Sequence, residues 1–177
     1  VNAVDQDGNT PLHFLCGNDK YGRTYYSFTL LKFFLNHPEI NKNAQNKIGY
    51  TPLMVASSQS NGMIVRFLIE YGADINLKSF KNQTALILAC HCRSTYIVKM
   101  LIDHHAEVDT QDLIYGDTAL TIISKYYQKN SNIMKILVEK GHPNVNIANW
   151  KGETPLLLAC QSNNINNVRL LVENGAE

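Results

Sequence analysis

The chain has 177 residues, of which 45% are hydrophobic and 18% charged, a composition typical of globular proteins that excludes an intrinsically disordered chain. Its 16 Lys and Arg balance 15 Asp and Glu, so the net charge of +1 lacks the basic character of nucleic-acid binders and anionic-membrane binders. No apolar run approaches the roughly 18 residues that span a bilayer. Four Cys are ordinary usage for an intracellular protein, and we expect a cytoplasmic or nuclear location.

The sequence is periodic. Five similar segments begin at Thr10, Thr51, Thr84, Thr118 and Thr154, with steps of 41, 33, 34 and 36 residues. The first reads Thr-Pro-Leu-His, and the others read Thr-Pro-Leu or Thr-Ala-Leu. Further landmarks keep the same register: an Asn or Asp eight or nine residues before each Thr, and a Gly or Asn two residues before it. These are Asn2, Asn43, Asn76, Asp109 and Asn146, and Gly8, Gly49, Asn82, Gly116 and Gly152.

Each landmark has a physical meaning. Thr favours a helix N-cap, and the Pro that follows it in three segments suits the first helical position. The Gly or Asn two residues earlier suits a left-handed residue at a hairpin tip. Two short apolar stripes at helical spacing follow each Thr, and Gly72, Gly141 and Gly175 come where the second helix should end. Such short helices need stacked neighbours for stability.

In chain order we therefore predict five two-helix repeats, at about 2–42, 43–75, 76–108, 109–145 and 146–177. The first carries about seven extra residues between its helices, within 17–27, and Pro38 occupies its C-terminal Gly position. His105 fills that position in the third repeat. The fourth has one extra residue at its tip and two around 127–132, so we expect altered curvature between the third and fourth repeats.

Thr-Pro-Leu-His at a 33-residue period, with Gly72-Ala73-Asp74-Ile75-Asn76 closing a repeat, resembles the ankyrin repeat family over essentially the whole chain. The resemblance implies an all-α solenoid of stacked helix pairs with projecting β-hairpin loops. The first and last residues of the chain fall at the same position within the repeat. Its last helix lacks the polar face of a terminal repeat. We therefore expect that further repeats or another domain flank it.

No motif for catalysis or cofactor binding appears, so we predict no enzymatic activity and no cofactor. One cluster has metal-ligand chemistry: Cys90, His91 and Cys92, with His104 and His105 nearby. The alternative is packing, because the position six residues after each Thr is Cys16, Ser57, Cys90, Ser124 or Cys160, as for a small buried residue. We favour packing and predict no metal site. The same reasoning makes His13 a hydrogen-bonding residue rather than a general base.

The resemblance places binding on the concave face, formed by the hairpin tips and the first helices. Four successive tips carry large apolar residues, and we predict that this fingertip row contacts a partner: Ile48, Phe80, Leu113, Ile114, Tyr115 and Trp150. The alternative is that Phe80 or Trp150 packs against the neighbouring tip. The palm, defined as the residues seven and eight after each Thr, adds Gln59, His91, Tyr126 and Gln161, with Ser58, Cys92, Lys125 and Ser162.

The Tyr-rich insert and Asn76 can each be interpreted as functional or as purely structural. The Tyr-rich insert of the first repeat is either a second contact surface or a flexible loop. Asn76, in Asp74-Ile75-Asn76 after Leu68, resembles the asparagines that an asparaginyl hydroxylase modifies, or else it only forms a hydrogen bond at the hairpin base.

The predicted function is recognition of a protein or peptide by a monomeric domain, without nucleic acid or membrane insertion. One alternative is a targeting domain of a larger enzyme or effector whose catalytic part lies elsewhere. Another is a structural spacer in a membrane or cytoskeletal protein. Exposure of the fingertip row distinguishes a binding module from a spacer, which does not need these side chains in solvent.

Overall fold

The computed structural model describes residues 1–17, 28–126 and 132–177, and in these ranges it contains helices and no strand. The first helices of the repeats are α1 (Pro11–Cys16), α3 (Pro52–Ser58), α5 (Ala85–His91), α7 (Ala119–Ser124) and α9 (Pro155–Gln161). The second helices are α2 (Phe28–Asn36), α4 (Gly62–Glu70), α6 (Thr95–Asp103), α8 (Asn132–Ile136), which continues as the π-helix η1 (Leu137–Gly141), and α10 (Ile165–Glu173).

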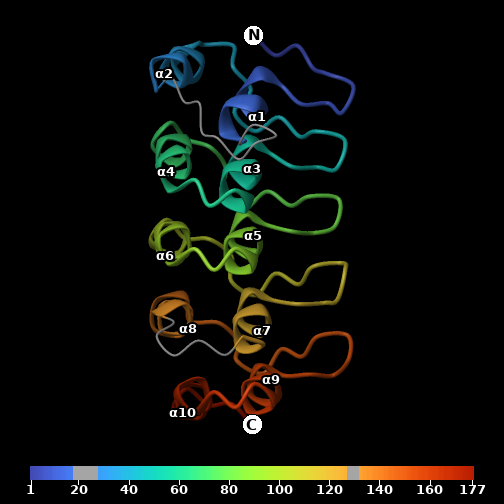
Figure 1. The fold of residues 1–177 in the computed structure, drawn as a ribbon, viewed down its shortest axis with the longest axis vertical. Helices are drawn as coiled ribbons and strands as arrows, with labels where there is room; N and C mark the ends of the chain where they lie inside the picture. The colour runs from blue at the N-terminus through green and yellow to red at the C-terminus, as the bar shows by residue number, and fades with distance from the viewer. Residues whose placement is uncertain (18–27, 127–131) are drawn as a thin grey trace.

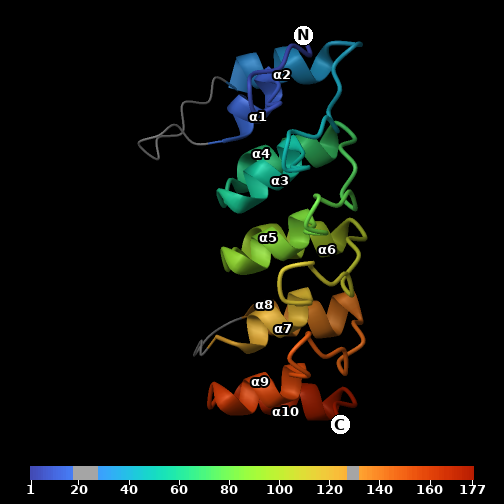
Figure 2. The ribbon, with the colours of Figure 1, turned by 90° about the vertical axis from the view of Figure 1, so that its right-hand side faces the viewer.

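The helices form two parallel columns. The first helices stack on one another in chain order, and the second helices stack beside them (Figure 1). Five loops project on the side away from the second helices. Figure 2 shows the elongated stack with the two termini at opposite ends. The predicted solenoid of helix pairs is therefore confirmed, and the projecting loops are closed by turns rather than by strands in the described residues.

The Thr landmarks begin the first helices as predicted. The side-chain oxygens of Thr51, Thr84, Thr118 and Thr154 each accept a hydrogen bond from the backbone N–H three residues later, at 3.2–3.3 Å. Pro occupies the start of α1, α3 and α9, where its missing N–H removes no helical hydrogen bond. Sequence-encoded caps thus define where each repeat enters its helix.

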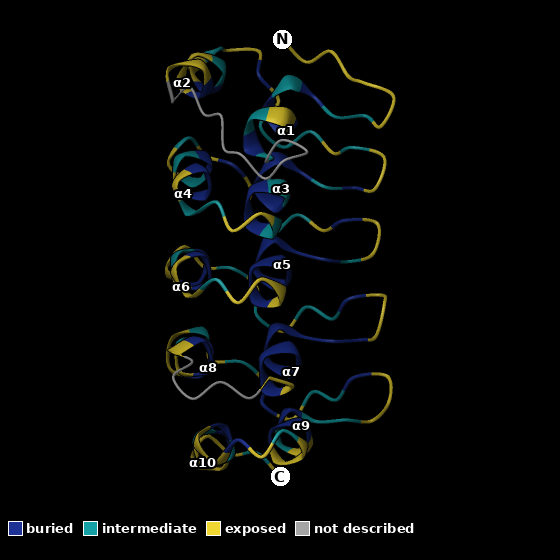
Figure 3. Ribbon diagram, in the orientation of Figure 1, coloured by how far each residue is buried: buried dark blue, intermediate teal, exposed yellow. Residues whose placement is uncertain are grey.

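The core lies between the two columns. The Leu that follows each Thr by two residues is at most 1% exposed in the first four repeats, at Leu12, Leu53, Leu86 and Leu120. Figure 3 shows the buried inner faces of the helices and the exposed ends of the loops. Because the described helices have only five to nine residues, their stability depends on this packing rather than on helix propensity.

One core prediction is wrong. In the position six residues after Thr, Cys16, Ser57, Cys90 and Ser124 are fully buried, whereas Cys160 is exposed. The residue three after Thr behaves likewise, since Met54 and Ile87 are buried and Leu157 is 51% exposed. Both positions are covered by the next repeat, and no later repeat in this chain covers α9.

The helix ends follow the prediction with one correction. Gly72, His105 and Gly175 adopt left-handed backbones with φ of 79°, 63° and 87°. In the fourth repeat the left-handed residue is His142, with φ of 49°, and not Gly141. The last turn of that helix is the π-helix η1, which accommodates one extra residue. The C-cap therefore falls one residue later, at His142. Pro38 cannot adopt this conformation, yet α2 still ends at Asn36, two residues before Pro38, just as α4 ends at Glu70, two residues before Gly72.

None of the helices in the described ranges has the length and hydrophobicity that a bilayer crossing requires.

Burial predicts different effects for equivalent Leu residues. Leu86→Ala should lower the free energy of unfolding by about 2–5 kcal/mol, because Leu86 is 1% exposed in the middle of the stack. Leu156→Ala, at the equivalent but only half-buried position, should have a smaller effect. Urea denaturation followed by circular dichroism measures both, and equal losses would contradict this account of the core.

Candidate binding face

Each projecting loop, called a finger here, is closed by one polar side chain. The fingers are residues 5–9, 46–50, 79–83, 112–117 and 149–153. In the second, the Asn46 side-chain oxygen accepts the backbone N–H groups of Ile48 and Tyr50, at 3.2 and 2.9 Å. The same arrangement closes the other fingers through Asp5, Ser79, Asp112 and Asn149, at 2.7–3.3 Å.

Sequence reasoning missed these closing residues, although a signal was present. In four repeats an Asp, Asn or Ser lies five residues before the Thr, and in the fourth Asp112 lies six before it. These are the residue types whose side chains bond to nearby backbone amides in turns. The predicted left-handed residues at the finger ends are confirmed, since Gly8, Gly49, Asn82, Gly116 and Gly152 have φ between 55° and 79°.

Neighbouring fingers are joined by backbone hydrogen bonds at their ends. The N–H of Lys47 donates to the carbonyl of Asp7 at 2.8 Å, and that of Phe80 to the carbonyl of Ile48 at 3.3 Å. Leu113 donates in the same way to Lys81, and Trp150 to Tyr115, at 2.8 and 3.0 Å. The five fingers therefore form one connected row.

The fingertip row is exposed to solvent, with side-chain exposures from 37% for Ile114 to 67% for Phe80. Two of its rings also pack against the preceding finger. Phe80 lies over Gly49 and Trp150 over Gly116, so closely that a Cβ atom on either glycine would collide with the ring. These rings combine both outcomes considered from the sequence: contact with a neighbour and a large exposed surface.

The palm residues lie at the C-terminal ends of the first helices. Gln59, His91, Tyr126 and Gln161 are all exposed there. Two smaller palm residues link neighbouring repeats, because Cys92 Sγ contacts the Ser58 carbonyl and Ser162 Oγ donates to the Ser124 carbonyl, both at 3.0 Å.

Cationic side chains lie over two aromatic rings in this region. Arg93, which sequence reasoning did not select, places its guanidinium carbon 5.4 Å from the Tyr126 ring centroid. Lys125 Nζ lies 5.9 Å from the Tyr115 ring and 2.5 Å from Asp117 Oδ2. These contacts orient Tyr126 and connect the fourth finger to the palm.

His13 has the structural role predicted for it. Its Nε2 lies 2.8 Å from the carbonyl oxygen of Tyr50 and therefore donates, while its Nδ1 accepts the Thr10 backbone N–H at 3.1 Å. This pairing needs the neutral ring, and burial lowers the pKa of His13. The ring joins the first repeat to the second.

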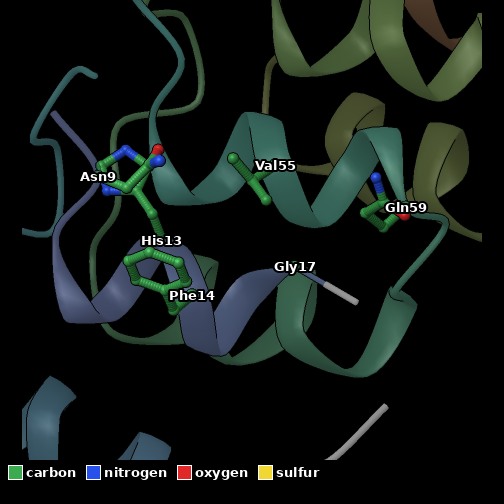
Figure 4. A pocket seen from close by; sticks show the side chains of 6 residues that line it. All are labelled: Asn9, His13, Phe14, Gly17, Val55 and Gln59. Atoms are coloured by element: carbon green, nitrogen blue, oxygen red, sulfur yellow. The ribbon is translucent and has the colours of Figure 1, made fainter. Parts of the chain in front are cut away.

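A small hollow of about 230 Å³ lies beside this contact, between α1 and α3 (Figure 4). Its lining includes Asn9, His13 and Gln59, with Phe14 exposed at one side. The hollow extends the candidate face beyond the second finger toward the start of the chain.

The Cys and His residues considered as metal ligands do not come together in one site. Cys90 is buried, and burial raises the pKa of its thiol, whereas Cys92 is exposed. His104 Nδ1 bonds the carbonyl of Met100 at 2.8 Å, and no three His, Cys, Asp or Glu in the described ranges are grouped to hold a metal ion. The Tyr-rich insert was predicted within 17–27, and residues 18–27 lie outside the described residues.

Asn76 forms hydrogen bonds to the next repeat. Its Oδ1 accepts the Glu107 N–H at 2.9 Å and its Nδ2 donates to the His105 carbonyl at 3.3 Å. Asn146 makes the same pair of contacts with Glu177 and Gly175. Asn76 hydroxylation stays a prediction, and its structural role is shared by the equivalent Asn residues.

A linear stack of short helix pairs with one row of connected loops defines a helical repeat solenoid. The chain belongs to the ankyrin repeat family, whose profile for three successive ankyrin repeats matches residues 1–79, 22–112 and 105–177. It carries no catalytic motif of its own.

Several curated proteins are similar to the chain. It is 30% identical over 176 residues to the B-cell lymphoma 3 protein homolog of Mus musculus, a match covering 98% of this chain and 38% of that protein. It is 29% identical over 164 residues to the E3 ubiquitin-protein ligase XBAT32 of Arabidopsis thaliana, covering 79% of the chain and 32% of that protein. The human transient receptor potential cation channel subfamily A member 1 matches at 25% over 185 residues, covering the whole chain and 16% of the channel. The chain therefore spans less than two-fifths of each relative.

The neutral His13 contact predicts a pH dependence of stability. Its folded-state pKa lies below the value of about 6.5 for an unfolded His, so its contribution is complete above that pH and is lost as the pH falls toward the folded-state pKa. Between about pH 7.5 and 5.5, the wild type should therefore lose more unfolding free energy than His13→Gln, which cannot titrate. Parallel losses in the two proteins would show that His13 is not the linked group.

Proposed function

We propose that this domain recognises another protein or a peptide segment through its concave face, formed by the fingertip row and the palm. The observation that carries the proposal is the row itself. Four successive fingers, joined by backbone hydrogen bonds, each expose a large apolar side chain at the same end.

Two physical arguments support binding over a spacer role. Exposed apolar side chains on short turns contribute little to folding, and a contiguous row of them is typical of an interaction site. Trp, Tyr and Phe also carry large contact areas at interfaces. A spacer in a membrane or cytoskeletal protein would not need Ile48, Phe80, Tyr115 and Trp150 in solvent.

The similarity to an E3 ubiquitin-protein ligase favours a second, more specific proposal. The domain would then recruit a substrate to a larger enzyme or effector whose catalytic part lies outside these residues. Both proposals use the same face and an intracellular, cytoplasmic or nuclear, location, with the isolated domain acting as a monomer. They differ in what the full-length protein does to the bound partner, so sequence beyond this chain and modification of the captured protein distinguish them.

The test is the double variant Phe80→Ala with Trp150→Ala. It should abolish or strongly weaken capture of specific partners from cell lysate, while the unfolding free energy falls by only about 1 kcal/mol per site, because each ring loses its contact with the preceding finger but no core packing. Quantitative mass spectrometry of the retained proteins, together with thermal denaturation of each variant, measures both effects.

The matched control is Phe33→Ala with Tyr96→Ala. These rings are 63% and 54% exposed on α2 and α6, in the column of second helices on the other side of the stack from the fingers. The control should retain the partners. Equal loss in both variants, or a collapse of the fold in the first, would contradict a binding role for the fingertip row.

A further inference from the structure

The ends of the fingers carry cations beside their apolar residues. Lys47 adjoins Ile48, Lys81 adjoins Phe80 and Lys151 adjoins Trp150, and all three lysines are exposed. Because the finger ends are connected, these lysines occur on three of four successive positions along one surface. The fourth finger has no lysine at its end, which carries Leu113, Ile114 and Tyr115, and the first finger has Asp7 there.

These lysines are not neutralised within the part of the chain that the structure describes. Lys78 and Lys140 form ion pairs with Glu107 and Asp103, at 3.0 and 2.6 Å. In the described ranges, no such pair joins a carboxylate to Lys47, Lys81 or Lys151.

The carboxylates of the same fingers lie at the finger bases and already have partners. Asp112 is 1% exposed and its Oδ1 accepts three backbone N–H groups. Asp117 is 2% exposed and bonds Lys125, Thr121 and Asn149. Glu153 is half-buried and accepts a hydrogen bond from Asn149 at 2.9 Å. Positive charge is therefore exposed at the ends, while negative charge is held below.

We propose that the fingertip row binds a protein segment in which Asp or Glu residues are interspersed with large apolar residues. This inference rests on the proposed function and specifies its partner class. The apolar partner residues pack against Ile48, Phe80 and Trp150, and the acidic ones pair with the adjoining lysines. Arg93, on the palm beside Tyr126, extends the positive surface below the fingers.

Recognition on this surface proceeds through side chains. The N–H groups of Lys47, Phe80, Leu113 and Trp150 are already bonded to the preceding finger, so they are not available to pair with a partner backbone. Apolar contact then supplies most of the affinity, and the lysines select acidic partners and accelerate association.

The probe is a displayed library of random peptides of roughly 15 residues, which span the row in extended form. Selection runs in parallel on the wild-type domain and on Phe80→Ala with Trp150→Ala, and peptides retained only by the wild type are synthesised. We expect enrichment of Asp, Glu and large apolar residues. Affinity, measured by fluorescence anisotropy, should fall as salt rises from about 0.05 to 0.3 M. The Debye length shortens over this range, which weakens the attraction between the lysines and the acidic peptide residues.

The decisive variant reverses the charges, with Lys47→Glu, Lys81→Glu and Lys151→Glu, and it should weaken these peptides about tenfold or more. The control reverses Lys99, Lys135 and Arg169 to Glu on the second helices and should have little effect. Circular dichroism verifies folding, and Lys→Gln at the three finger positions serves as a milder variant.

Two results would overturn the inference in different ways. Selected peptides that are neutral or basic, yet require Phe80 and Trp150, would refute acidic selectivity and leave the proposed function intact. If the selection yields no peptide that binds the wild type better than the Phe80 and Trp150 variant, the result would count against both the acidic-peptide inference and the proposed function.

Discussion

The candidate face depends on one repeated interaction, the backbone hydrogen bond from each finger to the one before it. A short loop with an exposed Trp or Phe would ordinarily lose conformational freedom when it binds, and that loss would oppose association. Here the N–H of Phe80 is bonded to Ile48 and that of Trp150 to Tyr115 before any partner arrives. The fingertip row is thereby preorganised, and this is what makes five separate loops one surface.

Stacking of the repeats makes those bonds possible. The helices are too short to be stable alone, and burial of Leu53, Leu86 and Leu120 against neighbouring repeats aligns the first helices in one column. Each finger leads directly into such a helix through a Thr cap. The spacing that buries the core is consequently the spacing that brings successive finger ends within hydrogen-bonding distance. Stability and the geometry of the face have the same origin.

Local chemistry explains which features were predictable. Thr caps and left-handed Gly or Asn residues depend on a few adjacent residues, so their periodic recurrence revealed both the helices and the fingers. Cys160 was misassigned because burial of its position comes from a following repeat rather than from its own helix. Gly141 was misassigned because the π-turn of η1 adds a residue that no local pattern marks. The sequence left open whether Trp150 packs against the neighbouring finger. Its position over Gly116, and the pairing of Lys125 with Asp117, depend on three-dimensional placement that spacing alone does not reveal.

Native-state amide hydrogen exchange, read residue by residue by NMR, tests the connected row most directly. The amides of Lys47, Phe80, Leu113 and Trp150 should exchange much more slowly than in an unstructured peptide, although their side chains lie in solvent. Gln6 is the internal control, because it has the same position in the first finger, which has no preceding finger in this chain to accept its N–H. Exchange of these four amides at the rapid rate of Gln6 would show that the fingers move independently and would contradict a preorganised face.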